Sequence, residues 1–362
     1  MLVVPNPMEP TDALDTEGRQ LLYDLVSTPS VSGQEEAAAA VLVEYFESHG
    51  REAYTDEVGN VHAPGDDAVL LTSHVDTVPG DVPVDIADGD EELDADGPVL
   101  WGRGSVDATG SLAAMAVAAV ETGVSFVGVV REETDSRGAR HLVETREAPG
   151  AVINGEPSGW DAVTLGYRGL LSGTYVATSE SGHTSRPDAN AVEHAMHWWQ
   201  RVEEAFPHDD YEPVFEQVTT KPVSVDGGLS EDGLSMEATM DVQFRVPPSL
   251  TPEDVRERAD AELEAGTVHW NDSIQPAMGS PRDPVATAIR GGIRRTGGEP
   301  RLLRKTGTAD VNIFAGAWDV PMATYGPGDS SLDHAPDERL PLKEFDRAVD
   351  VLVDAGRRLT DE

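Results

Sequence analysis

The sequence contains no cysteine among its 362 residues. A chain without cysteine can form no disulfide bond, and it offers neither a thiolate nucleophile nor a thiolate metal ligand. Any metal ion that it binds must therefore be held by histidine and carboxylate side chains.

Basic residues are scarce, since 26 lysines and arginines stand against 67 aspartates and glutamates and lysine occurs only three times. The resulting net charge of −41 repels nucleic-acid phosphates and anionic lipids, so neither is an expected partner. The acids are spread through every segment, which resembles proteins from salt-loving organisms, where about 1 M salt screens charges beyond ~3 Å. We expect a halophilic archaeal source, and salt adaptation explains the acidity better than a basic partner does.

Long apolar runs are also missing. No segment approaches the roughly 18 apolar residues of a membrane span. Residues 1–15 lack the basic start and the apolar core of a signal peptide. We therefore expect a cytoplasmic protein.

The hydrophobic pattern predicts an α/β fold. Apolar residues recur at helical spacing in residues 14–26 and 35–49. The β-rich runs Ala68–Ser73 and Val124–Val130 flank an alanine-rich helical segment, Ser111–Glu121. Strand, helix and strand in succession predict a mixed, mainly parallel sheet flanked by helices.

The middle of the chain has a pattern of its own. Strand-like alternation in residues 169–179, 235–245 and 267–270 is separated by helical patterns in residues 190–206 and 252–265. We interpret residues 167–276 as an inserted, smaller α+β domain. It would divide a catalytic domain into a first part, residues 1–166, and a second part, residues 277–362.

Polar residues with metal-binding chemistry follow the predicted strands. His74 and Asp76 end an apolar strand, and alternation sends both side chains to one face, as a ligand and its orienting carboxylate require. Taken alone, the pair favours a purely structural role. Asp107 lies in a glycine-rich loop before the alanine-rich helix, where a simple N-cap is the alternative.

Three further acids and a histidine occupy similar positions. Glu132 and Glu133 follow the next strand, and adjacent acids can serve as a metal ligand and a proton acceptor, or form a solvated turn. Glu156 and His334 follow later strands. Because so many oxygen and nitrogen donors share one position after sheet strands, the sequence indicates a site for Zn²⁺, Co²⁺ or Mn²⁺.

These segments, in this order, resemble the zinc-dependent family of acetylornithine deacetylase, succinyl-diaminopimelate desuccinylase and glutamate carboxypeptidase. The resemblance implies a zinc-peptidase-like catalytic domain with an inserted dimerisation domain, and two divalent metal ions, Zn²⁺ or Co²⁺. It implies that His74 and Glu156 hold one ion, that Glu133 and His334 hold the other, and that Asp107 bridges them. Glu132 would be the general base, with Asp76 behind His74.

The resemblance extends to four positions that would contact the substrate and to one further catalytic histidine. His183, in a Gly-His-Thr-Ser-Arg-Pro segment, corresponds to a family histidine that stabilises the oxyanion from a partner subunit. Arg245 corresponds to a position that holds a substrate carboxylate, or it is a surface charge on a strand. The segment that begins at Gly307 resembles one that lines the substrate pocket, which implies Thr308, Asp310 and Asn312 as substrate-binding residues.

Within the family, the longer runs Leu165–Gly169, Lys305–Ile313 and Gly326–His334 resemble most the branch that releases lysine or ornithine from a small amino-group carrier protein. What this implies is a homodimeric hydrolase that cuts the amide between the carrier's terminal glutamate and the amino acid, in lysine or arginine biosynthesis. The alternatives are an acetylornithine deacetylase, another small N-acyl-amino-acid deacylase or dipeptidase, and a catalytically silent metal-binding module.

Overall fold

The structure is a computed structural model that describes residue 8, residues 10–182 and residues 187–361. The chain forms two compact units. The first holds the described residues up to Leu165, then Gly279–Leu303 and the chain from Ala309 onward, and the second holds Gly166–Met278 and Arg304–Thr308. The predicted domain borders at 166/167 and 276/277 stay a prediction, because compactness alone does not define an independently folding domain.

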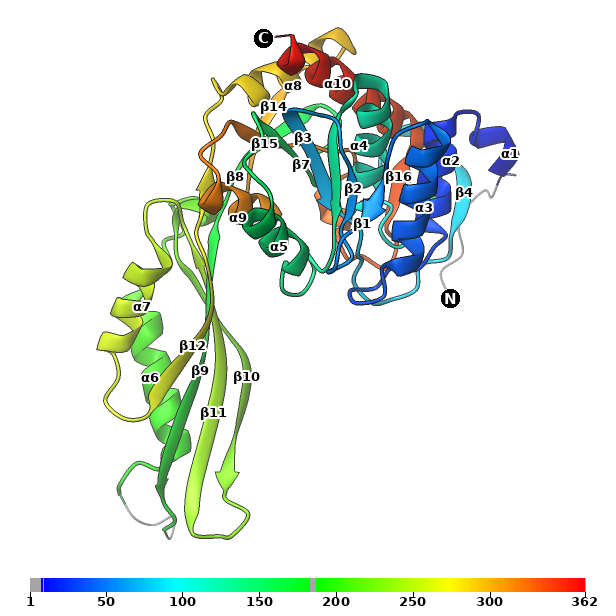
Figure 1. The fold of residues 1–362 in the computed structure, drawn as a ribbon. Helices are drawn as coiled ribbons and strands as arrows, with labels where there is room; N and C mark the ends of the chain where they lie inside the picture. Colours follow the sequence, from blue (N-terminus) through cyan, green and yellow to red (C-terminus); the bar gives the residue numbers. More distant parts are fainter. Residues whose placement is uncertain (1–7, 9, 183–186, 362) are drawn as a thin grey trace. The chain divides into compact units, whose positions relative to one another are not determined.

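The first unit alternates helices and strands (Figure 1). Its helices are α1 (Pro10–Ala13), α2 (Glu17–Val26), α3 (Glu36–Ser48), α4 (Thr109–Thr122), α5 (Arg137–Thr145), α8 (Pro284–Arg295), α9 (Asp310–Ala317) and α10 (Leu342–Thr360), with a 3-10 turn η2 (Ser330–Leu332). Its strands are β1 (Tyr54–Thr55), β2 (Val61–Ala63), β3 (Asp66–His74), β4 (Asp85–Asp90), β5 (Ala95–Trp101), β6 (Val124–Val129), β7 (Val152–Gly155), β8 (Ala162–Tyr167), β14 (Arg301–Lys305), β15 (Met322–Thr324) and β16 (Arg339–Pro341).

The main sheet of this unit runs in the order β1-β2-β6-β3-β7-β15-β8. Strands β6, β3, β7 and β15 are parallel neighbours, whereas β2 and β8 join antiparallel. The prediction of a mixed, mainly parallel sheet is therefore confirmed. Since the four parallel strands point the same way, their carboxyl ends lie along one edge of the sheet. A small second sheet, β16-β5-β4, stands beside it.

Helices cover both faces of the main sheet (Figure 1). On one face, alternate residues of the strands such as Leu71 and Phe126 pack in a core with apolar residues of α2, α3, α4, α8 and α10. On the other face, Leu70 and Val127 pack with residues of α5 and α9, including Phe314. Burial on both faces explains why β6 is a nearly continuous apolar run and why β3 has the run Ala68–Leu71 at its centre.

The second unit consists of a four-stranded antiparallel sheet in the order β10-β11-β9-β12, with two helices. Alternate residues of β9 and β11, such as Tyr175 and Phe244, form a core with Trp198 of α6. The elements are β9 (Gly169–Glu180), α6 (Ala191–Ala205), the 3-10 turn η1 (Val214–Glu216), β10 (Thr219–Leu229), β11 (Ser235–Val246), α7 (Pro252–Ala261), β12 (Thr267–Ile274) and β13 (Ala277–Met278).

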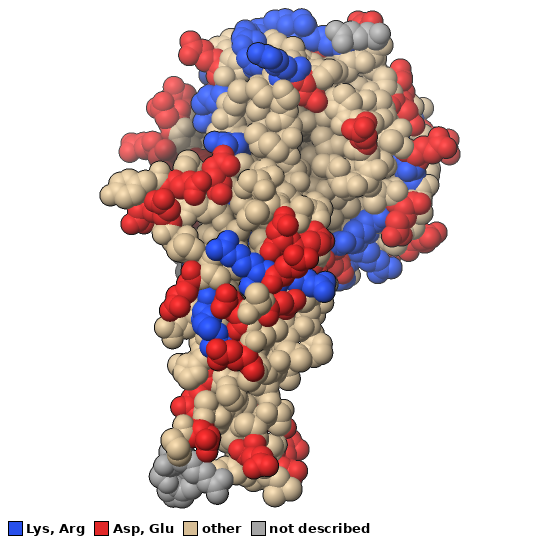
Figure 2. Space-filling view, turned by 90° about the vertical axis from the view of Figure 1, so that its left-hand side faces the viewer, with Lys and Arg blue, Asp and Glu red and all other residues tan. Residues whose placement is uncertain are grey.

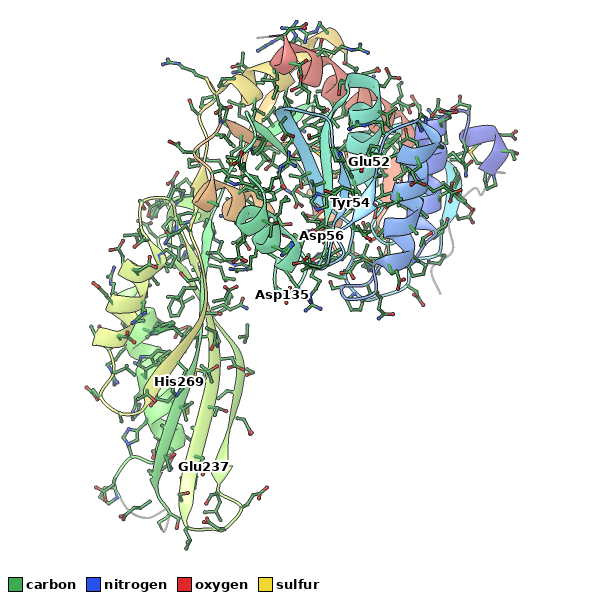
Figure 3. All side chains as sticks on the ribbon, viewed as in Figure 1. Glu52, Tyr54, Asp56, Asp135, Glu237 and His269 are labelled. Atoms are coloured by element: carbon green, nitrogen blue, oxygen red, sulfur yellow. The ribbon has the colours of Figure 1, made fainter. Side chains whose placement is uncertain are left out.

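Acidic side chains are spread over the visible surface of the molecule, while lysines and arginines gather in smaller groups (Figure 2). Figure 3 labels four acids: Glu52 and Asp56 on either side of β1, Asp135 before α5 and Glu237 on β11. None of the helices in the described part of the chain has the length and hydropathy needed to cross a membrane.

Candidate metal centre

His74 is the last residue of β3, at the edge of the sheet where the parallel strands end. Its side chain is 1% exposed, and its Nδ1 lies 2.8 Å from the backbone oxygen of Asp76. Because a carbonyl oxygen only accepts hydrogen bonds, Nδ1 must carry the proton in the neutral ring, which leaves the Nε2 lone pair available to a cation. Burial alone would lower the pKa of His74, but the carboxylates of Asp107 and Asp76 raise it well above 6.5.

Asp107 lies between two imidazoles. Its Oδ1 is 3.3 Å from Nε2 of His74 and its Oδ2 is 3.1 Å from Nε2 of His334. Although burial works in the opposite direction, the two histidines hold the pKa of Asp107 well below its usual range. The N-cap of α4 is Ala108, so Asp107 does not serve as the simple helix cap that the sequence left open.

Glu133 completes a compact group. One ligand atom each from His74, Asp107 and Glu133 lies within 4.8 Å of the other two. The Glu133 carboxylate is also 3.0 Å from Nε2 of His334, whose backbone has a left-handed φ of 61°. Asp107 raises the pKa of His334 to about 9. Burial raises the pKa of Glu133 to about 6, although the charge of His74 opposes this shift. Asp107 therefore contacts both histidines and Glu133 contacts His334, in a set that could bind two cations.

Glu132 and Glu156 follow β6 and β7, the strands on either side of β3. Burial raises the pKa of Glu132 well above 4.5, and the negative charge of Glu156 raises it further. Glu156 is 7% exposed, and its charge also raises the pKa of His74. So many acids in a buried place repel one another, and a divalent cation would relieve that repulsion.

The donor chemistry of this group fits a metal. Imidazole and carboxylate ligands without thiolates suit Zn²⁺, Co²⁺ and Mn²⁺. Burial raises the pKa values of Glu132 and Glu133, and the charges of neighbouring acids raise them further, so a divalent cation at this edge of the sheet would stabilise the charged forms. We conclude that the residues present fit a site for divalent cations.

Asp76 joins the two loops that surround His74. It is fully buried, and its Oδ1 accepts the backbone N–H of Glu132 at 3.0 Å. Its Oδ2 accepts the N–H of Glu133 at 3.2 Å and the hydroxyl of Ser32 at 2.7 Å. The sequence indicated that Asp76 lies behind His74. It indicated neither the bonds of Asp76 to the glutamate backbone nor its bond to Ser32.

The residues expected to contact substrate fall into two groups. Asp310 and Asn312 begin α9 in the first unit, and burial raises the pKa of Asp310 to about 7. Arg245 and Thr308 belong to the second unit, where Arg245 Nη1 donates to Thr308 Oγ1 at 3.0 Å. His183 lies outside the described residues. The roles of all five residues, four in substrate binding and one in catalysis, stay predictions.

Sequence reasoning missed Glu338, which is fully buried and accepts the backbone N–H groups of Val106 and Asp107. No sequence motif identifies Glu338, because its partners Val106 and Asp107 bind it through backbone amides and are far away in the sequence. The Gly102-Arg103-Gly104 segment indicates a turn but no partner for the loop before Asp107.

A parallel sheet with clustered histidines and carboxylates at the carboxyl ends of its strands defines an α/β protein of the metal-dependent hydrolase class. The sequence profile described as Peptidase family M20/M25/M40 matches residues 70–358. The chain belongs to this family, which confirms the predicted family and the predicted enzyme class.

Two relatives match almost the full length. A Deinococcus radiodurans protein named LysW-lysine hydrolase is 40% identical over 94% of this chain and 96% of its own length. A Sulfurisphaera tokodaii protein named LysW-lysine/LysW-ornithine hydrolase is 27% identical over 94% of this chain and 95% of its own length. Both names agree with the branch that the sequence resembles.

Solved structures agree in fold. The aminopeptidase PepT from Bacillus cereus superposes with a TM-score of 0.76 at 18% identity, covering 95% of this chain and 99% of that one. A Bacillus subtilis protein described as a dinuclear metal-binding peptidase superposes with a TM-score of 0.68 at 14% identity, covering 95% of this chain and 98% of that one. At these identities the likeness supports the fold alone.

Proposed function

We propose that this enzyme hydrolyses the amide bond that links lysine or ornithine to the C-terminal glutamate of a small amino-group carrier protein. The observation that carries the proposal is Asp107, held between His74 and His334, with the half-buried Glu132 near enough to His74 for its charge to raise the pKa of His74. The substrate follows from the relative that is 40% identical and named LysW-lysine hydrolase. The reaction would release the amino acid in lysine or arginine biosynthesis, and we place it in the cytoplasm.

We assign His74 and Glu156 to one cation, Glu133 and His334 to a second, and Asp107 to both. Zn²⁺ or Co²⁺ suits this donor set. When bound, the ions would supply Lewis-acid activation of water and of the amide carbonyl. His74 Nδ1 donates to the Asp76 carbonyl, so the ring presents Nε2 without a change of tautomer.

Glu132 is assigned as the general base. Its raised pKa supports this role, because a carboxylate of ordinary pKa is a poor proton acceptor at neutral pH. Glu132 would take the proton of the attacking water and pass it to the departing amine. His183 would stabilise the oxyanion, and Arg245, Thr308, Asp310 and Asn312 would hold the substrate.

A homodimer is also proposed, and β10 supports it. This strand forms one edge of the four-stranded sheet, and Val223, Val225 and Leu229 on it are 57%, 64% and 63% exposed. An edge strand with exposed apolar side chains is a ready site for pairing with another strand. A second copy of the same chain satisfies both features.

The decisive experiment compares substrates. The purified protein is incubated with carrier-linked lysine, carrier-linked ornithine and N-acetylornithine, and the released amino acids are quantified, with Glu132→Gln as the control. We expect release from the carrier and little from the acetylated compound. Release from N-acetylornithine alone would overturn the carrier assignment, and release from none of the three would favour a silent metal-binding module.

A further inference from the structure

Glu338 follows His334 by four residues and is completely buried. Its Oε1 accepts the backbone N–H of Val106 at 2.9 Å and that of Asp107 at 3.0 Å. Its own backbone oxygen accepts the N–H of Gly102 at 3.2 Å. The loop that carries His334 is thus bonded at three points to the loop that carries Asp107.

The second oxygen of Glu338 extends this link. Oε2 accepts a hydrogen bond from Arg103 Nη1 at 2.8 Å, and Arg103 Nε donates to the backbone oxygen of Gly80 at 3.1 Å. Gly80 belongs to the segment that follows His74 and Asp76. The Glu338 carboxylate and the Arg103 guanidinium therefore join the segment that follows His74 to the two loops that carry Asp107 and His334.

The Asp107 loop depends on such support. Gly102 and Gly104 have φ values of 155° and 83°, and the loop ends in the N-cap of α4, where no side chain caps the helix. Val106 is completely buried, so its backbone N–H has no access to water if Glu338 is removed. The position of the Asp107 carboxylate between two histidines follows from how this backbone is held.

We propose that Glu338 is a positioning residue that fixes the spacing between Asp107 and His334. It thereby sets the affinity for the cation assigned to Glu133 and His334. This inference rests on the proposed function, since it takes Asp107 and His334 as metal ligands. Glu338 is not assigned to either cation and acts through the bonds that join its own loop to the loop that carries Asp107.

The test uses Glu338→Gln, which keeps the size of the side chain but removes its charge and places an amide N–H₂ group among N–H donors. The matched control is Asp283→Asn. Asp283 also accepts backbone amides, including that of Val285 at 2.8 Å, and burial raises its pKa, but it caps α8 instead of a metal-ligand loop. Zn²⁺ is titrated calorimetrically into metal-free protein, the visible spectrum of the Co²⁺-loaded protein is recorded, and the melting temperature of the metal-free protein is measured.

We expect Glu338→Gln to bind the cation assigned to Glu133 and His334 about 10–100-fold more weakly, with an altered Co²⁺ spectrum. The cation assigned to His74 and Glu156, which also uses Asp107, should be weakened less. Asp283→Asn should lower the melting temperature and leave both affinities unchanged. If Glu338→Gln does not fold, Arg103→Gln serves in its place, because it removes the partner of Glu338 while the amide bonds remain, and it should weaken the same cation by several-fold.

Two different results would overturn the inference. Equal affinities in the wild type and in the folded variant would reject the positioning role while leaving the proposed function standing, as would equal weakening by Asp283→Asn. A wild-type chain that binds fewer than two cations would reject the proposed two-cation site itself, and the inference with it.

Discussion

Asp76 Oδ1 accepts the backbone N–H of Glu132 at 3.0 Å, so the residue that follows the metal-ligand strand β3 also holds the proposed general base in place. The same carboxylate lies 3.6 Å from Nδ1 of His74. One buried side chain therefore orients a ligand and positions the proton acceptor, and a change in it should affect both.

Asp76→Asn should lower kcat or metal affinity by about 10–100-fold, as is typical when the partner of a metal ligand is lost. The N–H groups of Glu132 and Glu133 bond to different oxygens of Asp76, so the N–H₂ group of an asparagine would face one of these two donors. Ser32→Ala removes a single bond to Asp76 and should have a much smaller effect. Turnover and zinc content of the two variants are compared, and equal behaviour of Asp76→Asn and wild type would contradict the role.

Glu132→Gln should keep both cations and lose about 10²–10⁴-fold in kcat, because only the proton acceptor is removed. Glu133→Gln should instead lose one cation. Metal content by mass spectrometry and turnover are measured on the same samples. Near-normal turnover of Glu132→Gln would exclude it as the base.

Removal of the cations should destabilise the protein. Buried acids that repel one another are left uncompensated, and a ligand at 100 times its Kd contributes about 2.7 kcal/mol to the free energy of unfolding. The melting temperature is measured after chelation and again after Zn²⁺ or Co²⁺ is restored. A melting temperature that does not respond to either ion would argue against a metal centre at the edge of the sheet.

Val225→Lys should weaken dimerisation at least about tenfold, or 1.4 kcal/mol, because it places a charge on the exposed apolar edge strand. Thr239→Lys is the control, since Thr239 is also exposed but lies on the interior strand β11. Mass is measured by light scattering over a range of concentrations. If both variants stay as dimeric as the wild type, β10 is not the interface.

The ion pair between Asp90 and Arg339 should make stability depend on acid pH. Although burial alone would raise it, Arg339, whose Nε lies 2.5 Å from Asp90 Oδ2, lowers the pKa of Asp90 below 3.8. A pKa that is lower in the folded state means that the pair stabilises the protein above about pH 4 and that this contribution is lost as the pH falls further. Asp90→Asn should therefore be less stable at pH 6, by about 1–3 kcal/mol, and should lose less on acidification.

The corresponding measurement is urea unfolding at pH 6 and pH 3 for the wild type and Asp90→Asn. Their difference in unfolding free energy should shrink at the lower pH. A difference that grows on acidification would show that Asp90 does not stabilise the fold in its charged form.

Most of the fold could be predicted because its elements carry a clear period. Apolar spacing predicted α2, α3 and α6 to within a few residues. Strand β10 was missed because Pro222, Gly227 and Gly228 interrupt its pattern, and β4 because it is rich in aspartate. The pattern of residues within a segment predicts a strand poorly where pairing with neighbouring strands, and not the segment's own residues, determines that it is a strand.

The candidate site divides in the same way. His74, Asp107, Glu133 and Glu156 each follow a strand or precede a helix, so their positions could be read from the sequence. The bonds of Asp76 to the glutamate backbone and of Glu338 to Val106 and Asp107 could not. They join side chains to backbone amides that are far away in the sequence. Because almost every residue has a backbone amide, the sequence does not indicate which amide is bonded.

Strand β15 lies between β7 and β8, although it follows them by more than 150 residues. During synthesis on the ribosome, β7 and β8 emerge long before the strand that separates them. The edge of β7 that will pair with β15 stays unpaired until residue 324 has left the exit tunnel, while the second unit can already complete its own sheet. The nascent chain thus presents an open, apolar strand edge for nearly half of its translation, and it is in this interval that chaperones would be most needed.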